Sequence, residues 1–412
     1  MIEDILTEAK QACRSFQLVD TQTKIQALDA IEQALRNEKQ RILLANQKDL
    51  DAARKNGMRP AMLDRLMLNE ERIDQMADGV AMIAQLDDPI GQEIRTIHRP
   101  NGLDIHQVRI PIGTVGVVYE ARPNVTVDIA AICLKTNNVC ILKGGKEAFY
   151  SNQVLSKVMQ EAVQDILPVN PIYSIEKMDH AVVTELICDR NHVDVVIPRG
   201  GKGLISHVVE NAKVPVIETG AGLCHLYVDK DANLDMAVEI AVNAKTQRPS
   251  VCNAIETILV HKDIAEAFLT QLKPRFKAVK IYGDERSLKV LDGQLATKEN
   301  YGTEYDDMIC NVKVVADIDE AIEHIYTYST KHSECIATEN KENASYFMDA
   351  LDSACVYQNA STRFTDGGQF GFGAEVGIST QKLHARGPIG LQEMTSTKYK
   401  IFGNGQIRKK GA

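Results

Sequence analysis

The spacing of hydrophobic residues changes along the chain, and each change predicts a different kind of structure. In roughly the first ninety residues, hydrophobic positions recur every three or four residues, which is the period of an amphipathic helix. We expect helices through residues 25–35, 42–53 and 72–86. Asp20 offers a cap before the first of them, and Gly57 offers a natural end after the second. The pattern predicts a layer of helices, and this region contains no recognisable catalytic or binding motif.

Two segments in which hydrophobic and polar residues alternate come next, at residues 93–99 and 103–110. Pro100-Asn101-Gly102 separates them, and Asn-Gly between alternating runs is typical of a β-hairpin. A further strand is expected near the end of the chain, at residues 397–402. A ribbon of this kind leaves open edges that favour pairing, so we expect it to take part in assembly.

From residue 114 onwards, short hydrophobic runs alternate with helical stretches, which is the pattern of parallel sheets covered by helices. The first set of expected strands covers residues 114–119, 138–142, 172–175, 193–197 and 214–217, with helices over 125–135, 152–166, 181–188 and 202–211. The second set covers residues 223–228, 256–261, 277–281, 312–315, 335–338 and 355–358, with helices over 234–246, 264–276, 318–326 and 342–351. The sequence therefore predicts an α/β protein with two parallel-sheet domains.

Composition narrows the classes of function. The chain of 412 residues has 56 acidic and 47 basic residues, and a basic face for nucleic acid is not expected. No hydrophobic run is long enough for a transmembrane helix, and the acidic start does not resemble a signal peptide, so we expect a cytoplasmic protein. Nine cysteines include no Cys-x-x-Cys pair, so we expect neither a metal site nor a disulfide framework.

One candidate for chemistry is the turn that follows the first predicted strand of the first sheet. Arg122, Pro123 and Asn124 stand between this strand and the next helix. A cation, a side-chain amide and a helix N-terminus together suit an anion or a developing oxyanion. The alternative is that Pro123 and Asn124 only begin the helix.

Two turns rich in glycine and lysine also follow predicted strands. They are Lys143-Gly144-Gly145-Lys146 and Arg199-Gly200-Gly201-Lys202, and neither matches a P-loop or a Gly-x-Gly-x-x-Gly motif. Glycine lets the main chain approach a phosphate, and a cation neutralises it. Two such turns at one edge of one sheet favour phosphate binding over ordinary strand-to-helix connections.

Cys252 is the best candidate for a nucleophile. It lies in a polar loop with Arg248, between a predicted helix and a predicted strand. A neighbouring cation favours the thiolate, whereas most of the other cysteines lie inside hydrophobic runs.

The order of these motifs resembles the aldehyde dehydrogenase superfamily. The residues that carry the resemblance are Asn124, Lys143, Gly200, Gly201, Glu218, Cys252 and Glu304. The resemblance implies that Cys252 forms a thioester and that Asn124 helps to hold the oxyanion. It also implies a nicotinamide cofactor, with contacts from Lys143, Lys146, Gly200, Gly201 and Glu304. Glu218, which oxidising members use to activate water, is not expected to be catalytic here because its surroundings differ.

Residues 315–336 narrow the resemblance to one branch of this superfamily. Their spacing of Ala, His, Tyr, Ser, Thr and Glu residues is similar to the signature of the branch that reduces L-glutamyl 5-phosphate to L-glutamate 5-semialdehyde, a step of proline biosynthesis. We expect the histidines of this stretch to be structural. Candidates for the substrate carboxylate and the leaving phosphate are Arg122, Arg248 and Arg363. Lys146 stands where NAD-using members carry a carboxylate, so NADPH is the expected cofactor.

The resemblance also implies an aldehyde dehydrogenase-like architecture in three parts. We expect a cofactor-binding domain of residues 1–98 and 112–222, a catalytic domain of residues 223–375, and an oligomerisation module of residues 99–111 and 376–412. The expected partners are a small acyl phosphate, further copies of the chain and, transiently, glutamate 5-kinase. Two alternatives remain open at this point, an oxidising aldehyde dehydrogenase that uses NAD and a non-catalytic scaffold that binds phosphate or nucleotide.

Overall fold

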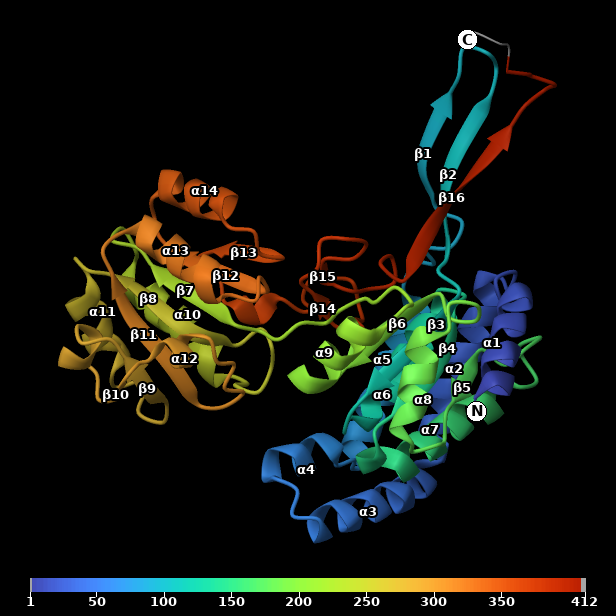
Figure 1. The fold of residues 1–412 in the computed structure, drawn as a ribbon, viewed down its shortest axis with the longest axis horizontal. Coiled ribbons are helices and arrows are strands. Elements are labelled where there is room, and N and C mark those ends of the chain that lie inside the picture. Colours follow the sequence, from blue (N-terminus) through green and yellow to red (C-terminus); the bar gives the residue numbers. More distant parts are fainter. Residues whose placement is uncertain (1, 409–412) are drawn as a thin grey trace. The chain divides into compact units, whose positions relative to one another are not determined.

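The computed structural model describes residues 2–408, which divide into two compact units. The first unit contains residues 2–218, 371–377 and 389–408, and the second contains residues 219–370 and 378–388. Each unit is built around its own parallel sheet (Figure 1). Within residues 2–408, no helix combines the length and the hydrophobicity needed to cross a membrane.

The first unit begins with a layer of helices. They are α1 (Glu3–Phe16), α2 (Thr21–Asn37), α3 (Lys39–Lys55), α4 (Pro60–Leu66) and α5 (Glu70–Gln85). The predicted cap is confirmed, because the Asp20 side chain accepts a hydrogen bond from the backbone N–H of Thr23. The spacing of large hydrophobic residues did not predict α1, whose buried face includes the small residues Ala9 and Ala12.

The sheet of the first unit has four parallel strands in the order β5-β4-β3-β6. The strands are β3 (Thr114–Tyr119), β4 (Val139–Gly144), β5 (Ile172–Ser174) and β6 (Val195–Arg199). The connecting helices are α6 (Pro123–Lys135), the short 3-10 helix η1 (Lys146–Ala148), α7 (Phe149–Val163), α8 (His180–Cys188) and α9 (Lys202–Asn211). Because the strands are parallel, the turns after β3, β4 and β6 meet at one edge of the sheet.

The fifth strand expected in this sheet, at residues 214–217, was wrong. Only a single bridge between Val196 and Val216 forms there. Two hydrogen bonds join the segment to β6, from Val196 N–H to the Pro215 oxygen and from Ile217 N–H to the Val196 oxygen. Pro215 has no N–H to extend a ladder, so Val214 and Ile217 are buried without a strand forming.

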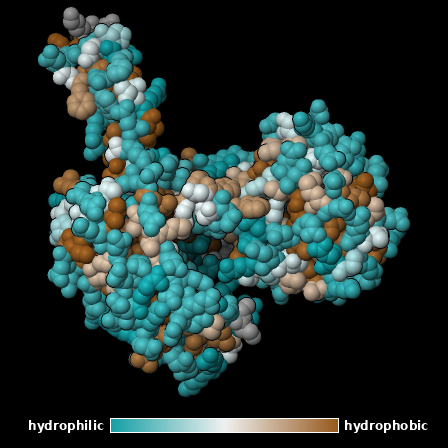
Figure 2. Space-filling view, turned by 180° about the vertical axis from the view of Figure 1, so that it is seen from behind, coloured by the Kyte–Doolittle hydropathy of each residue, from teal (hydrophilic) through white to brown (hydrophobic). Residues whose placement is uncertain are grey.

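The predicted hairpin and tail form one antiparallel sheet in the order β1-β2-β16. The strands are β1 (Glu93–His98), β2 (Asp104–Pro111) and β16 (Thr395–Phe402). This sheet exposes more than half of the surface of Tyr399, Ile401 and Phe402. Figure 2 shows hydrophobic side chains among polar ones on the sheet. The predicted hairpin and tail strand are confirmed, the structure adds that they pair with each other, and their role in assembly stays a prediction.

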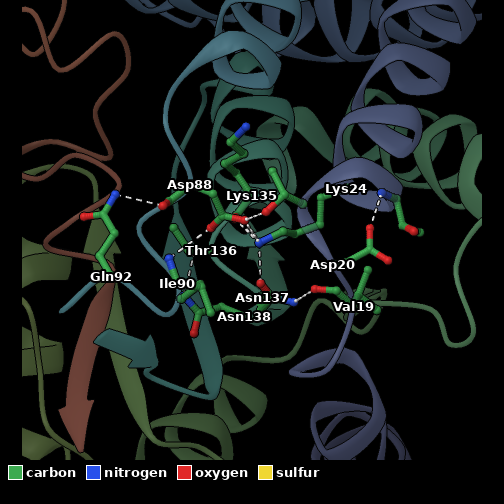
Figure 3. Close-up of polar contacts among 12 residues, drawn as sticks. Val19, Asp20, Lys24, Asp88, Ile90, Gln92, Lys135, Thr136, Asn137 and Asn138 are labelled. Atoms are coloured by element: carbon green, nitrogen blue, oxygen red, sulfur yellow. Dashed lines mark hydrogen bonds and ion pairs between the residues drawn. The ribbon is translucent and has the colours of Figure 1, made fainter. Parts of the chain in front are cut away.

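A buried polar cluster joins the helical layer to the sheet of the first unit (Figure 3). The ammonium group of Lys24, which is 1% exposed, lies 2.6 Å from the Asp88 carboxylate and donates to the Lys135 carbonyl and to the Asn137 side chain. Asn137 has a positive φ of 54° and its side chain donates to the Phe16 carbonyl. Burial lowers the pKa of Lys24, and Asp88 opposes this change. The cluster therefore ties four segments together with a charge that remains paired.

The second unit has a seven-stranded parallel sheet in the order β10-β9-β11-β8-β7-β12-β13. The strands are β7 (Cys224–Val228), β8 (Ile255–His261), β9 (Lys280–Gly283), β10 (Gln294–Leu295), β11 (Ile309–Val315), β12 (Ser333–Ala337) and β13 (Cys355–Gln358). The α-helices are α10 (Leu234–Thr246), α11 (Ala265–Leu272), α12 (Lys298–Tyr301), α13 (Ile318–Tyr328) and α14 (Lys341–Ala350), joined by the short elements η2 (Ser287–Lys289), η3 (Thr362–Phe364), β14 (Ile378–Ser379) and β15 (Gly387–Pro388). Buried side chains from α10 and α11 form one hydrophobic cluster with the strands, and those from α13 and α14 form another. The expected second α/β region is confirmed.

Candidate active site

Cys252 lies in the second unit, in the turn between α10 and β8. The N–H of Ala254 donates to the Val251 carbonyl at 3.0 Å and closes the turn. Cys252 is half-buried, whereas six of the nine cysteines are fully buried. Its placement in a partly accessible loop agrees with the prediction.

The residue after Cys252 is tied to the segment that contains η3. The Asn253 side chain donates to the carbonyl oxygens of Thr365 at 2.9 Å and Arg363 at 3.3 Å. In return, the Thr362 hydroxyl donates to the Asn253 carbonyl at 2.7 Å. The guanidinium of Arg363 donates to the side chains of Gln247 and Asn253. These bonds hold the Cys252 turn from one side.

Two of the three predicted arginines lie near Cys252. Burial lowers the pKa of Arg363, the Arg248 cation lowers it further, and a charge on Cys252 opposes both. Arg248 and Cys252 therefore both lie within electrostatic reach of Arg363. Arg122 belongs to the first unit, where it precedes α6.

A second contact holds the Cys252 turn from behind. A Cβ atom on Gly222 would lie 1.5 Å from the Cys252 carbonyl oxygen, so only glycine fits there. The thiol of Cys224 donates to the same carbonyl at 3.2 Å. Burial raises the pKa of Cys224 well above its usual value, which keeps this thiol protonated. The geometry therefore assigns Cys224 a supporting position and leaves Cys252 as the accessible thiol of the pair.

Glu304 lies beside this contact. One of its carboxylate oxygens accepts the N–H of Gly222 at 2.7 Å. The sequence predicted a cofactor contact for Glu304 but no role for Gly222 or Cys224 in supporting the nucleophile. A glycine immediately before a strand was the available signal for a close approach of two backbones.

In the first unit, Asn124 occupies the first turn of α6, after Pro123. Its exposed side-chain amide donates to the Asp128 carboxylate at 2.9 Å, one helical turn further on. Burial raises the pKa of Asp128 to about 6, and the bond from Asn124 and the charge of Arg199 oppose the rise. This bond orients the amide, with its nitrogen toward the carboxylate.

The two glycine–lysine turns lie at the same edge of the first sheet, as predicted, because β4 and β6 both pair with β3. The Lys143 side chain is buried and donates to the Gly144 carbonyl at 2.9 Å, and burial lowers its pKa. Lys146 is exposed. The N–H of Gly201, which caps α9, donates to the Glu120 carboxylate at 2.8 Å. The N–H at the start of α9 therefore meets a carboxylate of the chain itself.

Unsatisfied polar groups lie at the same edge. Buried polar atoms that find no hydrogen-bond partner among residues 2–408 include Arg199 Nε, Glu147 Oε2 and Asn152 Nδ2. A Cβ on Gly200 would lie 2.6 Å from the end of the Glu120 side chain, which would have to move. Unsatisfied buried groups beside a glycine turn suit a bound polar ligand. No cluster of three or more His, Cys, Asp or Glu side chains suited to a metal ion occurs in the part of the chain that the structure describes.

Comparison with known proteins identifies the family. Residues 1–303 match the profile of the aldehyde dehydrogenase family. The chain is 48% identical to gamma-glutamyl phosphate reductase of Clostridium tetani and 52% identical to that of Clostridium novyi, in both cases over 97% of this chain and 97% of the relative. The chain belongs to the aldehyde dehydrogenase family.

Solved structures of family members agree with this assignment. The crystal structure of gamma-glutamyl phosphate reductase from Thermotoga maritima has a TM-score of 0.96 and 44% identity, and the match covers 99% of this chain and 100% of that one. An acetylating aldehyde dehydrogenase from Geobacillus thermoglucosidasius has a TM-score of 0.72 and 17% identity, with 99% and 98% of the chains covered, and so supports the fold alone. The resemblance inferred from the sequence and the predicted α/β aldehyde dehydrogenase-like fold are both confirmed.

Proposed function

We propose that the chain reduces L-glutamyl 5-phosphate to L-glutamate 5-semialdehyde and phosphate, a step of proline biosynthesis. The observation that carries the proposal is a half-buried cysteine within electrostatic reach of Arg363, in a chain about half identical to gamma-glutamyl phosphate reductases. The chain is then an oxidoreductase of the aldehyde dehydrogenase family.

The chemistry begins at the sulfur of Cys252. Its thiolate attacks the acyl carbon, a C–S bond forms, and the C–O bond to phosphate breaks, which leaves a thioester. When bound, a nicotinamide cofactor supplies the hydride that reduces the thioester carbon. The resulting hemithioacetal collapses, the aldehyde leaves and the Cys252 sulfur is restored.

Charged and polar groups support these steps. Arg363 lies within electrostatic reach of Cys252, and Arg248 precedes Cys252 in the same loop. Both favour the thiolate and attract the leaving phosphate. Asn124 and the backbone N–H of Cys252 are the proposed donors to the oxyanion of the tetrahedral intermediate. Arg122 is a third candidate for binding the substrate carboxylate or phosphate.

NADPH is the proposed cofactor, held by Lys143, Lys146, Gly200, Gly201 and Glu304. The exposed Lys146 would attract the 2′-phosphate, because charge-assisted contacts contribute about 1.5–3 kcal/mol. Lys146→Glu should therefore weaken NADPH binding about tenfold to a hundredfold and leave NADH little changed, as measured by titration of cofactor fluorescence. Equal losses with both cofactors would exclude Lys146 as the discriminating residue.

The deciding experiment is the reverse reaction. A reductase of acyl phosphates should oxidise glutamate semialdehyde with NADP only when phosphate is present, whereas an oxidising aldehyde dehydrogenase needs only water and NAD. Cys252→Ala should fold and bind cofactor but lose at least about a thousandfold in turnover. Activity without phosphate would support the oxidising enzyme, and no turnover under any condition would support a binding scaffold.

The proposal also includes self-association of the chain and a transient protein partner. The exposed hydrophobic residues of β16 favour association of copies through the antiparallel sheet. Sedimentation of a chain truncated before Thr397 should show weakened association, and an unchanged assembly would contradict this role. Because the acyl phosphate is reactive, transient contact with glutamate 5-kinase in the cytoplasm is also proposed.

A further inference from the structure

Four consecutive residues beside the Cys252 turn, at positions 222–225, are each held by a side chain from a distant part of the second unit. The contacts run from Gly222 N–H to Glu304 at 2.7 Å, from Leu223 N–H to the Thr330 hydroxyl at 3.0 Å, from Cys224 Sγ to His332 Nδ1 at 3.6 Å, and from His225 N–H to Glu334 at 2.9 Å. Three of the four partners, Thr330, His332 and Glu334, alternate along one short segment. That segment is part of the 315–336 signature, to which the proposed reaction assigns no role.

The sheet brings this segment to the start of β7. Strands β7 and β12 are parallel neighbours, with Glu334 paired to His225 in register (Figure 1). Thr330 and His332 precede β12, on either side of Lys331, whose φ is +64°, so they reach the start of β7 from this turn, whereas Glu334 reaches it from the strand. The signature is therefore placed against the backbone that supports Cys252.

Cys224 is the link between this segment and the nucleophile. Its thiol donates to the Cys252 carbonyl at 3.2 Å, and its sulfur also contacts His332 Nδ1. Gly222 lies against the same carbonyl. The side chains that bind residues 222–224 therefore also fix the position of the Cys252 carbonyl.

His332 is suited to support rather than to proton transfer. It is fully buried, and burial lowers its pKa to about 4, so the ring is neutral near pH 7. Its Nδ1 lies 2.8 Å from the Ser333 hydroxyl, which continues to the Thr365 hydroxyl at 2.7 Å. Its Nε2 is buried with no partner among the described residues. These contacts favour the neutral tautomer of His332 that carries its hydrogen on Nδ1. In this tautomer Nδ1 is a donor, so the Cys224 S–H remains available to donate to the Cys252 carbonyl.

Glu334 completes the support. It is fully buried and accepts hydrogen bonds from the backbone and the ring of His225 and from the hydroxyl of Ser329. A buried carboxylate with several donors fixes its partners strongly, because moving any of them leaves the charge unsatisfied.

We propose that Thr330, His332 and Glu334 are positioning residues that act through Cys224 and Gly222 to fix the main chain of Cys252. They touch neither substrate nor cofactor in this role. The inference rests on the proposed function, since it takes Cys252 as the nucleophile.

The test compares two substitutions at Cys224. Cys224→Ala removes the hydrogen bond to Cys252 and should lower kcat about threefold to tenfold with KM nearly unchanged. Cys224→Ser can still donate and should recover most of the loss. Cys335→Ala is the matched control, because Cys335 is also fully buried in this unit and packs in the hydrophobic cluster with α10. It should leave the kcat of the folded protein unchanged.

A second measurement separates positioning from general stability. The rate at which iodoacetamide alkylates Cys252, followed by mass spectrometry across pH, should change in Cys224→Ala and His332→Ala but not in Cys335→Ala. His332→Asn, whose amide can replace the Nδ1 donor, should restore part of the rate. The double variant with alanine at 224 and 332 should lose less than the two single losses combined.

The outcomes are distinct. Equal behaviour of Cys224→Ala and Cys335→Ala, or fully additive losses at 224 and 332, would overturn the positioning role. An active Cys252→Ala variant would instead overturn the proposed nucleophile. If His332→Ala fails to fold, the Cys224 pair and the alkylation profile still decide the question.

Discussion

The two residues proposed for the chemistry, Asn124 and Cys252, are held in different ways. Asn124 is fixed within its own helix, by Pro123 before it and by the hydrogen bond to Asp128 four residues later. The Cys252 turn is held by residues far away in the sequence, including Asn253 bonded to Thr365 across 112 positions. The position of Asn124 therefore depends on one turn of helix, whereas the position of Cys252 depends on the fold of the whole second unit.

This difference changes what a substitution near each residue should do. Around Asn124, a change should affect the amide and little else. Around Cys252, a change in a supporting residue should move the backbone of the nucleophile, and a displacement of about 1 Å can cost about a hundredfold in rate. The four predictions below test the two cases, from the largest expected effect to the smallest.

Asn124→Ala should lower kcat about a hundredfold to a thousandfold, because it removes one donor to the oxyanion. The thermal unfolding temperature and cofactor affinity should change little, since the exposed side chain bonds only within its helix. Steady-state kinetics and calorimetry provide the measurement. A large loss of stability with normal turnover per folded molecule would reduce Asn124 to a helix-start residue.

Gly222→Ala should lower kcat about a hundredfold and reduce stability, because the new Cβ would overlap the Cys252 carbonyl oxygen. Gly79→Ala is the control, since a Cβ at Gly79 in α5 meets nothing within 4 Å. The control should be as stable as the parent or more stable. Normal turnover in Gly222→Ala would mean that the Cys252 turn tolerates displacement and would remove the contrast with Asn124.

Asp128→Asn should lower kcat about threefold to tenfold at neutral pH, because a neutral partner no longer selects one orientation of the Asn124 amide. In the parent, protonation of Asp128 below pH about 6 should have the same effect, so kcat should fall there, and the variant should lack this acidic limb. The pH profile of kcat is the measurement. In the Asn124→Ala background the substitution should have no further effect on turnover.

The same carboxyl group makes a prediction for stability. Its folded pKa of about 6 lies above the usual 3.8, so the folded state binds the proton more tightly. Its stabilising contribution is complete below pH about 3.8 and is lost as the pH rises through about 6. Asp128→Asn should therefore unfold at a higher temperature than the parent at pH 7, and an equal or lower temperature would contradict the raised pKa.

Much of the fold could be predicted because local patterns determine it. The predicted limits of β3, α9, α10 and β13 agree with the structure, and the Asn-Gly turn placed the hairpin. The predicted strand at 214–217 failed because a hydrophobic run does not specify hydrogen bonds, and Pro215 has no N–H to donate one. The two-residue strands β10, β14 and β15 are too short to show a period.

Some features of the candidate site also follow from local sequence, and others depend on the tertiary structure. The sequence by itself determined that Cys252 would lie in a polar loop and that Asn124 would begin a helix, because both follow from neighbouring residues. Only the tertiary structure decided that Gly222 and Cys224 support Cys252 and that residues 330–334 lie behind them. Their contacts depend on β7 lying between β8 and β12 in the sheet. Strand order depends on how separate elements bury their surfaces against one another. It is therefore a property of the whole chain, and a local sequence pattern does not determine it.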